Sequence, residues 1–177
     1  MNRKVIVIGS SVLVIILSVL YINLGGFEPP KLRLSTSNDF YVLGKTHKGL
    51  VSDKELQKLM DEVAQLYQDS NFEGFFTIIY KGNPDNVEDT LQVLVGIGSE
   101  QKLDKWKSYK EYTIEKIESY QNVTASITAS SWVAPAPDEV NQQIRDFAKN
   151  RNHTLKNQII EKYFKSDSII TEIPIIE

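Results

Sequence analysis

The sequence contains no cysteine and only two histidines, His47 and His153. Without cysteine there are no disulfides, no thiolate metal sites, no cysteine nucleophile and no lipidated N-terminal cysteine. Neither histidine has carboxylates at the spacing that would complete a metal shell, so His47 is expected in a loop or at the rim of a pocket. The sequence therefore predicts no metal site and no cofactor.

Common catalytic motifs and excess basic charge are also absent. The chain has no Gly-x-Ser-x-Gly, no P-loop and no Gly-x-Gly-x-x-Gly, which removes the usual motifs of serine hydrolases and of nucleotide binding. All 23 acidic residues and 18 of the 20 basic ones follow Phe27, giving that part a net charge of −5. An acidic domain without a basic stripe argues against nucleic acid as a partner.

No charged residue occurs from Val5 to Phe27. This run predicts one transmembrane helix within residues 5–24, because about 20 apolar residues cross the bilayer core. Arg3 and Lys4 precede it, so the positive-inside rule keeps the N-terminus cytoplasmic and sends the C-terminal part to the periplasmic or extracellular side. A cleaved signal peptide is the alternative. We expect residues 1–30 to be signal-anchor and linker, and residues 31–177 to be one domain.

The remaining chain contains one pattern twice. Residues Phe75–Lys81 align without a gap with Ile159–Lys165, and a second apolar strand follows each. Upstream, apolar positions at helical spacing repeat at the same separation, and residues 34–43 fall opposite residues 117–126. Two copies predict a pseudo-symmetric α+β domain made of duplicated β-α-β-β units, with Phe75–Tyr80 as a central strand.

Residues 99–110 join the two halves. They hold Lys102, Lys105, Lys107 and Lys110 around Trp106. A basic and aromatic cluster can contact anionic lipid, and the other interpretation is a solvated linker with one buried tryptophan.

Glu161 is the most informative carboxylate, because it lies inside an otherwise apolar strand. Charged groups are seldom buried unless paired, so Glu161 either faces water from an edge strand or attracts a cationic ligand in a cleft. Tyr163 shares its face of the strand by the two-residue period. Trp132 and Tyr80 are aromatic residues at strand ends that either line such a cleft or pack in the core.

Four short stretches carry a family resemblance: Val42–Gly49, Ile78–Pro84, Ile160–Tyr163 and Thr171–Ile175. Over residues 31–177 the chain resembles the GyrI-like, or effector-binding, domain. The resemblance implies one curved antiparallel sheet with two helices and a cleft near the pseudo-twofold axis. It also implies a hydrophobic, often cationic, small-molecule ligand held by Glu161 and Tyr163, with Trp132 and Tyr80 as further ligand-binding residues.

The chain departs from that family in having no helix-turn-helix and in carrying the predicted membrane anchor. The resulting expectation is a membrane-anchored, externally facing domain that binds small molecules and is not an enzyme. Two alternatives remain open. One is a hydrolase of reactive small molecules that uses Trp132 and Glu161, as the resemblance to GyrI-like hydrolases implies, and the other is a ligand-free envelope interaction module.

Overall fold

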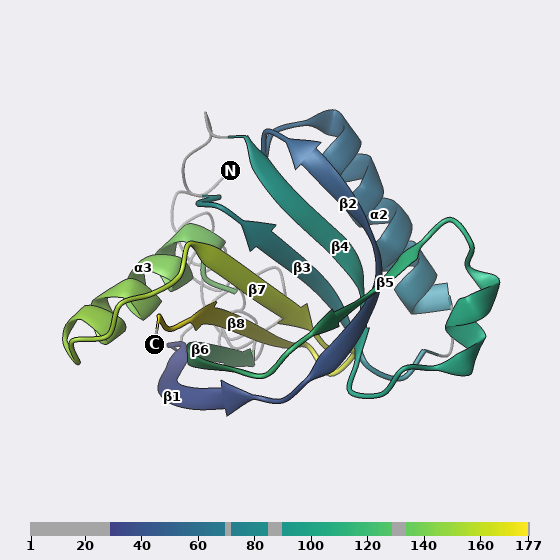
Figure 1. The fold of residues 1–177 in the computed structure, drawn as a ribbon. Coiled ribbons are helices and arrows are strands. Elements are labelled where there is room, and N and C mark those ends of the chain that lie inside the picture. The colour runs from purple at the N-terminus through teal and green to yellow at the C-terminus, as the bar shows by residue number, and fades with distance from the viewer. Residues whose placement is uncertain (1–28, 70–71, 85–89, 129–133, 177) are drawn as a thin grey trace, which may run out of the picture.

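The computed structural model describes residues 29–69, 72–84, 90–128 and 134–176. These residues form one curved antiparallel sheet of eight strands with two helices packed against it (Figure 1). The predicted anchor, residues 5–24, lies outside the described residues. Within the described ranges, no helix has the length and apolar character needed to cross a bilayer.

The sheet has the strand order β1-β6-β8-β7-β3-β4-β2-β5. From its two ends inwards, the order matches β1 with β5, β6 with β2, β8 with β4 and β7 with β3. The two strands of each match have the same place in the two halves of the chain, so the order confirms the predicted duplication. β3 and β7 are the central pair, which confirms the central place predicted for Phe75–Tyr80. The elements are β1 (Lys31–Ser37), β2 (Phe40–Gly49), α2 (Lys54–Asp69), β3 (Phe75–Lys81), β4 (Leu91–Ser99), η1 (Asp104–Ser108), β5 (Thr113–Ile117), β6 (Tyr120–Thr128), α3 (Pro137–Lys149), β7 (Gln158–Tyr163) and β8 (Ser168–Pro174).

The first predicted strand of each half is in fact two strands that exchange partners between the halves. β1 pairs with β6, placing Leu34 opposite Val123, and β5 pairs with β2, placing Ile117 opposite Phe40. The chain turns after β1 and after β5, and the Asp39 carboxylate in the first turn accepts a hydrogen bond from the second turn at 2.7 Å. Each half is therefore a five-element unit in which the first strand belongs to the other half's part of the sheet.

The two faces of the sheet have separate apolar cores. On the helix face, α2 contributes Leu56 and Val63 and α3 contributes Ile144, and these pack against strand residues such as Ile78. The second face carries a smaller cluster with no helical member: Phe40, Val42, Phe75, Ile79, Leu94 and Ile160. Because side chains alternate along a strand, consecutive residues of β3 and β7 supply both cores.

Trp106 lies in η1 and is 1% exposed. This confirms the interpretation of residues 99–110 as a linker with one buried tryptophan. The indole packs with the helix-face core, so it cannot serve as a surface aromatic beside the lysines.

Candidate functional site

Glu161 occupies the middle of β7, paired on one side with Ile78 of β3 and on the other with Thr171 of β8. Its side chain is on the helix face, because it alternates with Ile160 of the second-face core. The residue is only 5% exposed. The edge-strand interpretation, in which this carboxylate faces water, is therefore wrong.

Two tyrosines surround the Glu161 carboxylate. The Tyr163 hydroxyl donates a hydrogen bond to Glu161 Oε2 at 2.8 Å. Burial raises the pKa of Tyr163 above its usual value, and the Glu161 charge and this hydrogen bond raise it further. Tyr80 lies on the same face of β3, and burial followed by the Glu161 charge raises its pKa as well. Both phenols keep their protons at neutral pH and lie within the field of the carboxylate.

A groove of about 460 Å³ opens beside Tyr163 on the helix face. The Phe76 and Tyr163 rings pack with centroids 5.7 Å apart, and the Lys165 ammonium lies 4.9 Å from the centre of the Tyr67 ring. Glu161 is not among the groove's lining residues, so Tyr163 separates the groove from the carboxylate. The lining is Ala64, Tyr67 and Gln68 of α2 with Phe76, Tyr163, Phe164, Lys165 and Asp167.

The structure thus brings Glu161, Tyr163 and Tyr80 together at the centre of the sheet. Trp132, the fourth predicted ligand-binding residue, lies outside the described residues, so its predicted place beside Glu161 stays a prediction. The groove residues of α2 were not predicted, because the helix pattern indicates an apolar face without showing which strand residues it reaches.

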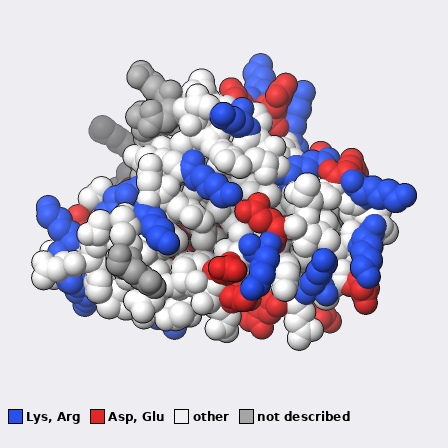
Figure 2. Space-filling model, viewed as in Figure 1, with Lys and Arg blue, Asp and Glu red and all other residues white. Residues whose placement is uncertain are grey.

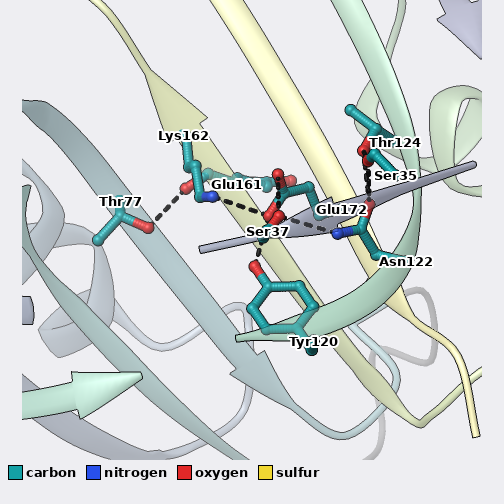
Figure 3. Close-up of polar contacts among 9 residues, drawn as sticks. All are labelled: Ser35, Ser37, Thr77, Tyr120, Asn122, Thr124, Glu161, Lys162 and Glu172. Atoms are coloured by element: carbon teal, nitrogen blue, oxygen red, sulfur yellow. Dashed lines mark hydrogen bonds and ion pairs between the residues drawn. The ribbon is translucent and has the colours of Figure 1, made fainter. Parts of the chain in front are cut away.

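Sequence reasoning also missed a buried polar network on the second face (Figure 3). Lys162 Nζ lies 2.8 Å from the Glu172 carboxylate, and the two residues are 8% and 5% exposed. Ser37 donates to Glu172 at 2.8 Å, and the Tyr120 hydroxyl donates to its other oxygen. The signal was available, since the residue after Glu161 on a strand must face the opposite side of the sheet.

The helix-face arrangement can hold a positive charge. A buried carboxylate with two protonated phenols offers charge and hydrogen bonds. Among the described residues there is no cluster of three metal-ligating side chains. On the face seen in Figure 2, basic and acidic side chains are interspersed.

The chain matches no protein-family model and no curated protein sequence. Solved structures do match its fold. An integron cassette protein from Vibrio cholerae has 16% identity and a TM-score of 0.55, with 82% of this chain and 95% of that chain covered. The EcmrR C-terminal domain has 12% identity and a TM-score of 0.56, covering 85% and 99%. A hydrolase from Listeria innocua has 10% identity and a TM-score of 0.53, covering 85% and 94%. At these identities the likeness is one of fold, and this fold is the curved sheet with two helices that the sequence resemblance implies.

Proposed function

We propose that the domain binds hydrophobic cations on the helix face of its sheet, with Glu161 as the charge that selects them. The observation that carries this proposal is a 5%-exposed carboxylate on a central strand, bonded by Tyr163 and adjoining a groove with aromatic walls. A carboxylate in a low-dielectric site gains most from a cationic partner. The EcmrR C-terminal domain shares this fold, which is the one that the resemblance to effector-binding domains implies.

Binding begins in the groove, where the faces of Tyr67 and Phe76 meet the ligand. Each cation–aromatic contact contributes about 0.5–2 kcal/mol. The Lys165 ammonium, which lies 4.9 Å from the centre of the Tyr67 ring, must move aside for a ligand cation to take its place there. Because Tyr163 lies between the groove and Glu161, its phenol must move aside for a ligand to reach the carboxylate. The hydrogen bond from Tyr163 to Glu161 satisfies the carboxylate until then.

The test compares the wild-type protein with Glu161→Gln, which keeps the shape and removes the charge. We expect tetraphenylphosphonium to lose about thirtyfold or more in affinity, because losing one partner of a buried charge pair costs about 2 kcal/mol or more. Neutral triphenylphosphine oxide should change little. Titration calorimetry measures both ligands.

Glu118→Gln serves as the matched control, because Glu118 is an exposed carboxylate that lines neither the groove nor a further cavity on the second face of the sheet. This variant should bind both ligands as the wild type does. Equal cation affinity in wild type and Glu161→Gln would remove Glu161 from the site.

We also propose that residues 5–24 anchor the protein in a membrane and that the domain faces the periplasmic or extracellular side. The uncharged run from Val5 to Phe27 and the preceding Arg3 and Lys4 support this topology. Pro29 and Pro30 then precede β1, which begins at Lys31, so the chain enters the folded domain directly after the expected linker.

A further inference from the structure

A second cavity, of about 590 Å³, opens at the second face of the sheet, and its volume falls within the roughly 300–1,000 Å³ typical of small-molecule pockets. Its lining comes from the β1–β2 turn, the start of β3, the end of β4 with the residues after it, and the adjoining ends of β7 and β8. Of the groove residues on the helix face, only Phe164 also lines this cavity. Neither Glu161 nor Tyr163 takes part in it.

Three phenylalanine rings form one wall of the second-face cavity. Phe40 and Phe75 meet edge to face with centroids 5.6 Å apart, and Phe75 and Phe164 lie 5.4 Å apart. Leu103 and Ile170 add aliphatic surface. A flat aromatic ligand would bury apolar area against these rings and stack on them.

The buried charged residue of the cavity lining is Lys162. Its ammonium lies 4.6 Å from the Phe40 ring centre and 5.5 Å from that of Phe75, and the residue is 8% exposed. An ammonium has three N–H groups, and Lys162 lines the cavity whereas its ion-pair partner Glu172 does not. The pair therefore presents its positive end to the cavity.

The charges around the cavity select against a full negative charge on the ligand. Glu172 already neutralises Lys162, and Ser37 and Tyr120 hold that carboxylate in place. Asp39, Glu73 and Glu100 are exposed acids at the cavity's rim, of which Asp39 is paired with Lys116 at 2.6 Å. A ligand that is neutral but accepts a hydrogen bond uses the ammonium without meeting this repulsion.

We propose that this cavity is a second ligand site, for neutral aromatic compounds that carry a carbonyl, such as aryl ketones or quinones. The carbonyl accepts a hydrogen bond from Lys162 Nζ, and the ring lies against Phe40, Phe75 and Phe164. The site is distinct from the proposed cation site, because it lies on the opposite face of the sheet and uses a group of opposite charge.

Benzophenone is the probe, because it is a neutral diaryl ketone that inserts into nearby C–H bonds under ultraviolet light. The full-length protein is irradiated with it, and labelled peptides are identified and counted by mass spectrometry. We expect labels at Phe40, Phe75 and Ile170, located to the residue by fragmenting the labelled peptides, because Phe76 and Asp167 of the helix-face groove fall in the same peptides. The benzophenone concentration at half-saturation gives an apparent affinity. The anionic analogue 4-benzoylbenzoate should label these peptides more weakly.

Lys162→Met removes the donor and keeps an apolar stem. The double variant Lys162→Met/Glu172→Gln removes both charges. It therefore avoids the loss of folding stability that follows when Glu172 is left buried without its partner. We expect either variant to need about tenfold more benzophenone for the same labelling, the usual effect of losing a hydrogen bond to a charged group. Diphenylmethane, which has the two rings but no acceptor, should compete for labelling equally well in wild type and double variant.

Glu161→Gln is the matched control on the other face, and it should label as the wild type does. The Glu161→Gln variant separates the two proposals. If it loses cation binding but is labelled by benzophenone as the wild type is, the result supports both sites. Unchanged labelling in the folded double variant, or labels found only at residues of the helix-face groove, would overturn the second site.

Discussion

Glu161 and Lys162 are neighbours in the chain and lie on opposite faces of the same strand. Each is almost fully buried, and each is held by phenol groups or a counter-charge: Tyr163 bonds Glu161, and Glu172 pairs with Lys162. Two successive residues of β7 thus place a negative group in one core and a positive group in the other. Their ligand preferences are expected to differ for this reason.

The buried phenols make the protein sensitive to alkaline pH. Burial and nearby carboxylates raise the pKa of Tyr80, Tyr120 and Tyr163 in the folded state, whereas the unfolded chain ionises near the ordinary value of about 10. Above about pH 10, the folded state binds more protons than the unfolded chain does. The free energy of unfolding therefore falls as pH rises. Below about pH 10, both states keep these phenol protons, and the stability that is lost at higher pH is fully present.

Urea unfolding at a series of pH values measures this loss, and tyrosinate absorbance should show these phenols ionising only as the protein unfolds. Tyr163→Phe should lose stability less steeply above about pH 10, because one raised pKa is gone. Ionisation of all eight tyrosines near their ordinary pKa in a folded protein would contradict the expectation.

At the scale of elements, the end of α2 is tied to the beginning of β3. The Tyr67 hydroxyl donates a hydrogen bond to the carbonyl of Gly74 at 3.0 Å. Gly74 has a φ of +124°, and an added Cβ would lie 2.0 Å from the Gly98 carbonyl oxygen of β4. The helix, the central strand and its neighbour therefore meet at a residue that must be glycine.

Gly74→Ala should lower the free energy of unfolding by about 1–3 kcal/mol, the cost of a side chain in this backbone conformation. Urea unfolding followed by circular dichroism measures the change. The exposed neighbour Glu73 provides the control, and Glu73→Ala should stay within about 0.5 kcal/mol of wild type. A Gly74→Ala protein as stable as the wild type would show that the chain relaxes at this point.

At the scale of the whole molecule, a symmetric scaffold carries asymmetric charge. The sequence match sets Glu161 against Thr77, but it is one residue out of register, because Phe75 lies in the second-face core and Ile159 in the helix-face core. In the central β3–β7 pair, Glu161 lies beside Ile78 and Lys162 beside Thr77. The first half keeps small or apolar groups where the second half has charges. The centre of the sheet therefore offers one carboxylate and one ammonium, where a fully symmetric sheet would have two like charges repelling each other.

The proposed topology also belongs to the whole molecule. A reporter that is active only after export, fused behind residue 177, should be active in cells. Replacing Arg3 and Lys4 with uncharged residues should weaken this orientation, because the positive-inside rule depends on them. Activity of a cytoplasmic reporter at the same point would rule the orientation out, and release of a uniformly shortened protein would indicate cleavage.

Much of the fold could be predicted from the sequence, because the ungapped match of Phe75–Lys81 to Ile159–Lys165 identifies equivalent central strands. The face on which Glu161 lies did not follow from that match, because the match sets Glu161 against Thr77, which lies beside Lys162 on the other face of the sheet. The exchange of β1 and β5 could not be predicted, because their partners lie far away in the chain and the apolar pattern does not specify pairing. The Lys162–Glu172 pair was missed for a similar reason, since it depends on the register of β7 against β8.

The exchanged strands bear on how such a chain can arise. Every pairing between the halves joins equivalent parts: β3 with β7, and each first strand with the other half's second strand. Two separate copies of a single half could make the same pairings as a homodimer. The strand order is therefore the one expected if an ancestral dimer of half-length chains was fused into one gene, after which the two copies were free to acquire different charges at the former dimer axis.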